Sequence, residues 1–95
     1  MRRIVNRKIY DTATATVIAT DRYWDGSNFE RNGRNKTLYR TGKNAYFVVN
    51  TTCWQGERDT LEPLSVQEAI LCYEELPEQT VSFEDAFPGI KVEEA

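Results

Sequence analysis

The sequence predicts an α+β fold, in which a small antiparallel sheet of about four strands carries one main helix packed on one face. Three observations support this fold class. Residues 12–23 alternate with a period of two, residues 36–50 resemble a hairpin, and residues 64–78 have helical periodicity. Ninety-five residues are enough for one domain with a modest core, so we expect a single domain over residues 1–95. The first few residues and residues 93–95 are expected to be frayed.

The N-terminal third is expected to form the first hairpin. Residues 1–11 have extended character, with arginine and lysine side chains that discourage pairing at a sheet edge. Asp11 favours a turn, because aspartate side chains cap nearby backbone amides. The strand around Ile9 should then pair with the strand around Val17. The alanines at 13, 15 and 19 share a face with Val17, and their small size would let a helix lie close to the sheet.

The stretch KTLYRTGKNAYFVVN, residues 36–50, is expected to be the centre of the sheet. Gly42-Lys43 fits a two-residue type II′ turn, because glycine adopts a positive φ without steric cost. This turn pairs Tyr39 with Tyr46 and Leu38 with Phe47. One face of the hairpin would carry Leu38, Phe47 and Val49, and the other Tyr39, Tyr46 and Val48. A slip of one residue would exchange the faces.

Residues 24–36 and 51–63 are both predicted to be loops, because glycine, asparagine and other turn-forming residues interrupt any periodicity there. Between the second loop and Pro77, the spacing predicts a helix over residues 66–76. Ser65 and Glu68 have the spacing of a capping box. The apolar stripe expected to pack on the sheet consists of Val66, Ala69, Ile70 and Tyr73, extended by Leu76.

The tail from Gln79 has two possible structures. Val81 and Phe83 could add an edge strand, or Ser82 with Asp85 could cap one helical turn that brings Phe83 and Phe87 together. Ile90 and Val92 are expected to tuck against the body of the protein.

Composition makes enzymatic chemistry unexpected. The chain has no histidine, its five glycines are scattered, and its carboxylates follow no catalytic pattern, so we expect no enzyme, no cofactor and no metal site. Cys53 and Cys72 lack CxxC spacing. We expect both to be thiols with Cys72 buried or half-buried on the helix, although spacing alone leaves a disulfide open. Neither an 18-residue apolar run nor a signal-peptide pattern is present, so a cytoplasmic protein is expected.

Charge is divided unevenly along the chain. Residues 1–56 carry a net charge of +6 and residues 57–95 a net charge of −9. Such polarity favours binding of charged partners, or packing of one half on the other. An acidic partner-binding surface would consist of Glu68, Glu74, Glu75, Glu78, Glu84 and Asp85. An alternative basic and aromatic surface for nucleic acid would consist of Arg31, Arg34, Lys36, Tyr39, Arg40 and Tyr46, with Arg2, Arg3, Arg7, Lys8 and Lys43 nearby.

Three segments carry a resemblance to a known group of proteins. They are KIYDTATATVIAT at 8–20, TLYRTGKNAYFVV at 37–49 and PLSVQEAI at 63–70. Together they resemble small phage and mobile-element proteins of the anti-CRISPR type, which share KxYDTxTA, LYxTxxGxYFL and PLSxxEA patterns. The chain departs from the pattern at 42–44, where its glycine comes earlier. The resemblance implies a bacterial host cell and a Cas effector as the partner, and it implies no catalytic residue.

The function expected from these observations is inhibition by binding, in which the acidic surface blocks nucleic-acid binding or cleavage by a Cas effector complex. The alternative is a small nucleic-acid-binding accessory protein of a mobile element that uses its basic N-terminal half. A structural module with a role in homo-oligomerisation is a third possibility. No membrane partner is expected.

Overall fold

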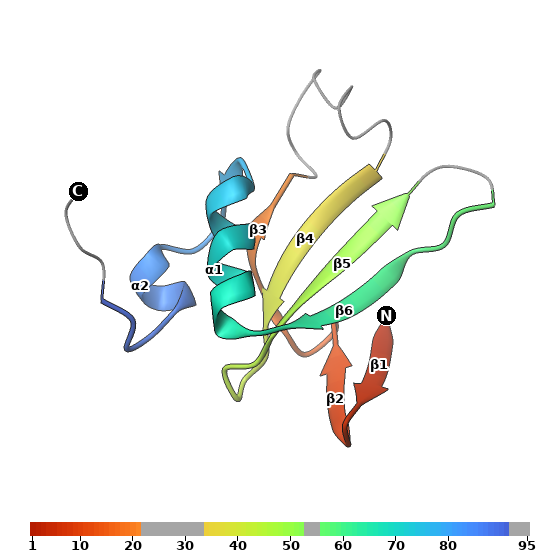
Figure 1. The fold of residues 1–95 in the computed structure, drawn as a ribbon, viewed down its shortest axis with the longest axis horizontal. Helices are drawn as coiled ribbons and strands as arrows, with labels where there is room; N and C mark the ends of the chain where they lie inside the picture. Colours follow the sequence, from red (N-terminus) through yellow and green to blue (C-terminus); the bar gives the residue numbers. More distant parts are fainter. Residues whose placement is uncertain (22–33, 53–55, 92–95) are drawn as a thin grey trace.

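The computed structural model describes residues 1–21, 34–52 and 56–91, with the side chain of Arg34 excluded. Its main sheet is antiparallel with five strands in the order β6-β5-β4-β3-β7, and β1 and β2 form a separate two-stranded sheet (Figure 1). The α+β class is therefore confirmed, although the main sheet exceeds the four strands predicted. The elements are β1 (Arg2–Val5), β2 (Lys8–Asp11), β3 (Thr16–Thr20), β4 (Arg34–Arg40), β5 (Tyr46–Thr52), β6 (Thr60–Leu64), α1 (Val66–Glu75), β7 (Glu78–Gln79) and α2 (Phe83–Ala86).

The first hairpin joins β1 to β2, so the predicted pairing of the Ile9 and Val17 strands is wrong. Ile9 lies opposite Ile4 instead. Asn6 and Arg7 connect the two strands, and both have positive φ, at 51° and 65°. Two successive left-handed residues produce a tight turn whose twist matches that of the strands, which favours this local pairing. The predicted turn at Asp11 is present, since its carboxylate accepts a hydrogen bond from the Ala13 amide at 2.9 Å.

Strand β3 contains a bulge that interrupts the predicted alternation. The register with β4 shifts between Val17 and Ala19, and Ile18 and Ala19 are both fully buried in the core under α1. A bulge places two successive residues opposite one partner, so the period of two is lost at that point. Ala19 does lie in the core as predicted, whereas Ala13 is exposed.

The hairpin of β4 and β5 forms in a register one residue away from the prediction. Tyr39 lies opposite Phe47, and Leu38 lies opposite Val48. The loop has three residues, 42–44, closed by a hydrogen bond of 2.8 Å from the Thr41 amide to the Ala45 carbonyl. Asn44, with φ of 61°, takes the left-handed position, and Gly42 has a negative φ. This is the geometry of a three-residue hairpin loop, so the predicted type II′ turn is wrong.

The shifted register decides which residues face the helix. Leu38, Tyr46 and Val48 belong to the cluster under α1. Phe47 and Val49 belong to a second cluster on the opposite face, with Tyr10 and Leu61, and Tyr39 packs against it. The prediction placed Leu38 on the same face as Phe47 and Val49. This assignment is wrong, because the one-residue shift in register puts Leu38 on the opposite face from these two residues.

The predicted loop over 51–63 contains strand structure at both ends. Strand β5 continues to Thr52, and β6 begins at Thr60. Pro63 lies in β6 opposite Phe47. Because proline has no amide hydrogen to donate, it is tolerated in a strand at a sheet edge, which is the position of β6.

Helix α1 follows its predicted signals closely. Ser65 is the N-cap, and both hydrogen bonds of the capping box with Glu68 are present. The buried side consists of Ala69, Cys72, Tyr73 and Leu76, with Ile70 partly buried. Val66 was predicted on this stripe but is 41% exposed, so the stripe is buried only from Ala69 onward. Neither helix in the described residues has the length and apolar character to cross a membrane.

The tail adopts the second of its two predicted structures. Ser82 caps α2 by accepting from the Asp85 amide, and the rings of Phe83 and Phe87 lie 5.0 Å apart. The predicted edge strand at 81–83 is absent from the structure, whereas Glu78–Gln79 forms β7 against β3. Ile90 is 41% exposed, so it does not tuck against the body. Val92 and residues 93–95 lie outside the described residues.

A glycine substitution tests the observed turn against the type II′ turn. A Cβ at Gly42 meets no atom within 4 Å, and the residue has a negative φ. Gly42→Ala should therefore raise the free energy of unfolding by about 0.4–1 kcal/mol, through the lower entropy of the unfolded chain. A type II′ turn would require a positive φ at this residue, and alanine would then destabilise the protein. Urea unfolding followed by circular dichroism measures the difference.

The control for this experiment is Gly56→Ala. Gly56 also has open space around its Cβ position, but its φ is +88°. Alanine should lower the free energy of unfolding there. If both substitutions destabilise the protein alike, the turn assignment at residues 42–44 is incorrect.

A second substitution tests the capping box. Ser65→Ala removes the side-chain acceptor of the Glu68 amide, a bond of 3.1 Å, and should lower the free energy of unfolding by about 0.5–2 kcal/mol. Ser65→Asp retains an acceptor and should restore most of the loss. An unfolding midpoint of Ser65→Ala equal to that of the wild type would refute the assignment.

Candidate functional site

Six carboxylates of the predicted acidic surface lie on consecutive elements at one side of the sheet (Figure 1). Glu68, Glu74 and Glu75 lie on α1, Glu78 lies in β7, and Glu84 and Asp85 lie on α2. All six side chains are exposed. The acidic segment, defined as residues 66–86, therefore carries its charges on the outside of structured elements.

An aromatic cluster anchors the acidic segment to the sheet. The ring of Phe87, which follows α2, stacks on Tyr46 of β5 with centroids 4.9 Å apart. Tyr73 of α1 contacts Phe87 edge-on at 5.5 Å and Phe83 at 5.8 Å. Aromatic contacts of this kind add about 0.5–1.5 kcal/mol each beyond the area that they bury. The two helices and the sheet thus share one apolar contact region.

Hydrogen bonds from the same cluster fix the backbone of the tail. The hydroxyl of Tyr46 donates to the Ala86 carbonyl at 2.8 Å, and that of Tyr73 donates to the Val81 carbonyl at 2.7 Å. The guanidinium of Arg40 donates to the Asp85 carbonyl. Burial raises the pKa of both tyrosines, so their phenol groups remain protonated donors at neutral pH.

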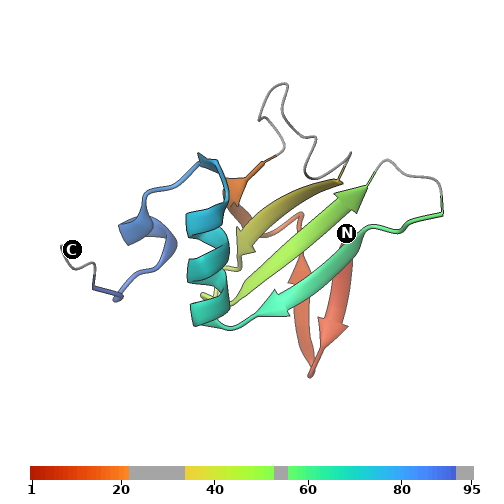
Figure 2. The same ribbon diagram turned by 45° about the horizontal axis from the view of Figure 1, so that its top comes forward.

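A groove of about 270 Å³ runs between α1 and the part of the sheet that the helix leaves uncovered. Figure 2 shows the strands extending beyond α1 on this side. Residues 68, 71, 72 and 75 lie on one stripe of α1, because positions three and four apart are neighbours on a helix. The lining residues are Lys36, Val48, Asn50, Glu62, Leu64, Glu68, Leu71, Cys72 and Glu75.

The groove is predominantly acidic, with three glutamates and one lysine among its described lining residues. Leu71 is 63% exposed beside these charges and offers an apolar contact to a partner. Glu62 was missed by the sequence prediction, because turn-forming residues around it predict a loop where the structure has β6. The carboxylate of Glu68 accepts a hydrogen bond of 2.9 Å from the Ser65 amide, and this bond lowers the pKa of Glu68. Glu68 therefore stabilises the N-terminus of α1 and also contributes a negative charge to the groove.

The described residues of the alternative basic surface, Lys36, Tyr39, Arg40 and Tyr46, do not come together on one surface. Tyr39 and Tyr46 lie on opposite faces of the sheet, and Tyr46 is 4% exposed, so its ring has no free face for a base. Lys36 lines the acidic groove, and Arg40 is bonded to the tail. Arg31 and the side chain of Arg34 lie outside the described residues, as does Cys53.

Within the described ranges, no group of three His, Cys, Asp or Glu side chains is arranged to hold a metal ion. Comparisons with models of protein families, with curated proteins and with solved structures find no match to this chain. The candidate site is therefore described by its own geometry, which is a set of exposed carboxylates on α1, β7 and α2 and a groove beside α1 that contains Glu68, Leu71 and Glu75.

The lowered pKa of Glu68 predicts a contribution to acid stability. The contribution is present above the pKa of an unfolded glutamate and is lost as the pH falls through the lower folded pKa. Glu68→Gln should therefore lose less stability than the wild type on acidification through this window. Titration of the Glu68 carboxyl carbon by NMR, in the folded protein and in urea, measures both pKa values directly. A folded value at or above the unfolded one contradicts the prediction.

Proposed function

We propose that this protein is an inhibitor that acts by binding, and that its acidic segment occupies a basic surface of a host nucleoprotein complex. A Cas effector complex is the partner that we propose, in keeping with the anti-CRISPR-like sequence pattern. The observation that carries the proposal is the set of exposed carboxylates on elements anchored to the sheet by the aromatic cluster.

The chemistry of such a partner matches this surface. Cas effectors hold guide and target strands in positively charged channels. Carboxylates at fixed positions on a helix can compete there for Lys and Arg side chains, and charge complementarity raises the association rate. Anchoring of α1 and α2 reduces the entropy lost on binding, since the charged elements are already ordered.

The groove beside α1 supplies a centre for the proposed interface with the partner. Interfaces gain most of their affinity from a few well-packed central residues, and charges at the rim contribute less. Leu71 lies between Glu68 and Glu75 on the same stripe of α1 and is exposed. An apolar side chain or the aliphatic stem of an arginine from the partner would pack on Leu71 while its charge meets the glutamates.

Charge reversal tests the proposed binding surface. The triple variant Glu74→Lys, Glu75→Lys and Glu78→Lys should abolish inhibition of target-DNA binding by the effector. The fold should survive, because all three side chains are exposed and lysine is favourable in the last turn of a helix. Inhibitor titration against DNA binding by candidate effectors measures the effect, with circular dichroism to verify folding.

The control reverses two charges in the other direction, Arg31→Glu and Arg34→Glu, and should reduce inhibition less. Lys36 is left unchanged, because it lines the groove of the proposed interface. A greater loss in this control would place the contact surface in the basic half instead. A pull-down that recovers no Cas effector, together with no inhibition by the wild type, would reject the proposed partner.

A further inference from the structure

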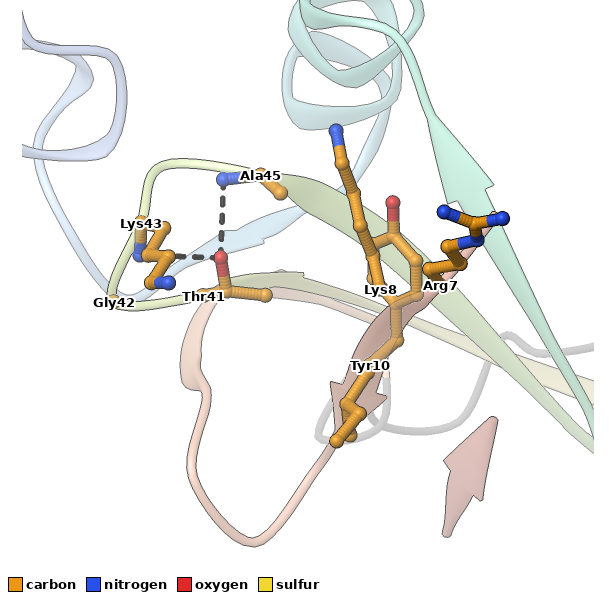
Figure 3. A pocket seen from close by; sticks show the side chains of 8 residues that line it. Arg7, Lys8, Tyr10, Thr41, Gly42, Lys43 and Ala45 are labelled. Atoms are coloured by element: carbon orange, nitrogen blue, oxygen red, sulfur yellow. Dashed lines mark hydrogen bonds between the residues drawn. The ribbon is translucent and has the colours of Figure 1, made fainter. Parts of the chain in front are cut away.

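A second concave surface lies at the end of the sheet where β4 turns into β5. It is a cleft of about 550 Å³ between the turn of β1 and β2 and the loop at residues 41–45. Figure 3 shows Arg7 and Lys8 on one side of the cleft and residues 41–43 on the other. The cleft is lined by Arg7, Lys8, Ile9, Tyr10, Thr41, Gly42, Lys43 and Ala45.

Tertiary contacts hold the two sides of the cleft together. Tyr10 of β2 is buried and contacts Phe47 of β5 edge-on, with ring centroids 5.7 Å apart. Arg3 of β1 donates a hydrogen bond of 2.7 Å to the Leu61 carbonyl of β6. These contacts tie the small sheet to the main sheet, so the cleft has defined walls.

The lining of the cleft is chemically suited to an anion. Three cationic side chains, those of Arg7, Lys8 and Lys43, contribute to it, and none of the described residues that line it is acidic. The Thr41 hydroxyl oxygen accepts hydrogen bonds from the amides of Lys43 and Ala45, at 3.3 and 3.1 Å (Figure 3). Because both of these hydrogen bonds use the oxygen as an acceptor, the hydroxyl hydrogen remains available to donate.

The same cleft also has an apolar wall formed by Ile9 and Ala45, to which the largely buried Tyr10 adds little exposed surface. Its volume lies in the range of about 300–1,000 Å³ that is typical of small-ligand sites. A ligand that contacts both the cationic side chains and the apolar wall must join an anionic group to a larger planar or apolar group. A nucleotide has this composition, with phosphate oxygens for the cations and a base for the apolar wall.

We infer that the cleft between the two turns is a binding site for a nucleotide phosphate. The phosphate belongs either to a free nucleotide or to a single-stranded nucleic acid, and the recognition chemistry is the same for both. This inference extends beyond the proposed inhibitor function, because it concerns cationic residues that take no part in the acidic segment. It relocates the alternative basic surface rather than repeating it. Arg7, Lys8 and Lys43 were expected only near that surface, and none of its six main residues is among the described residues that line the cleft.

The test is NMR titration of the 15N-labelled full chain with three probes, namely inorganic phosphate, ATP and a ten-residue oligothymidylate. Amide shifts at residues 7–10 and 41–45 that saturate are the expected result. Tighter binding of ATP than of the oligonucleotide on a per-site basis identifies a free nucleotide, and the reverse order identifies a strand. Affinity should fall with added salt, since phosphate contacts release counterions.

Lys8→Ala combined with Lys43→Ala should weaken binding of the preferred probe by about tenfold or more, because removing one charge-assisted hydrogen bond costs about that factor in affinity. Both lysines are exposed, so the fold should be retained. Arg58→Ala is the control of matched charge type. Arg58 is exposed and precedes β6, at the opposite end of the sheet, and its replacement should change affinity by less than about twofold.

Two results would overturn the inference. One is the absence of saturating shifts at the cleft residues with both ATP and the oligonucleotide. The other is binding that the Arg58→Ala variant weakens as much as the double lysine variant does, which would indicate a general charge effect.

Discussion

The three-residue loop at residues 42–44 is the constraint on which the rest of the structure depends. Asn44 takes the left-handed conformation there, and the loop sets the register of the two longest strands. Because side chains alternate between faces, a change of one residue in the loop would move every apolar residue of β5 to the other face relative to β4. The observed register directs Tyr46 toward the helix and Phe47 toward the small sheet.

These two residues link each sheet face to a different surface. Tyr46 binds the tail through its ring contact with Phe87 and its hydrogen bond to Ala86, and so positions the acidic segment. The ring of Phe47 contacts that of Tyr10 edge-on. This contact holds the small sheet beside the loop at residues 41–45, and the two together line the cleft. Neighbouring residues of one strand thus support two surfaces of opposite charge. The basic N-terminal half of the sequence therefore lines the cleft, and the acidic C-terminal half forms the acidic segment.

The two proposals assign these surfaces to different chemistry. A nucleoprotein complex offers both basic protein surfaces and phosphate groups, and the acidic segment is proposed for the first and the cleft for the second. The acidic segment combines exposed carboxylates with one exposed apolar side chain, Leu71, in its groove. The cleft, in contrast, has the size and polarity of a small-ligand site. The two proposals can therefore succeed or fail separately.

The sequence by itself determined the features that depend on neighbouring residues. It was sufficient for the α+β class and the capping box of α1, and it offered the cap of α2 as one of two structures for the tail. Both caps follow from contacts within a few residues. Tertiary structure decided the hairpin register, the strand status of residues 60–64 and the pairing of Ile9 with Ile4. It also assembled the groove at Glu62 and the cleft at Lys43. Strand β6, the groove and the cleft join residues distant in sequence, and their geometry depends on packing energies that local patterns do not contain. The two hairpins are local, but more than one turn type is compatible with their sequences.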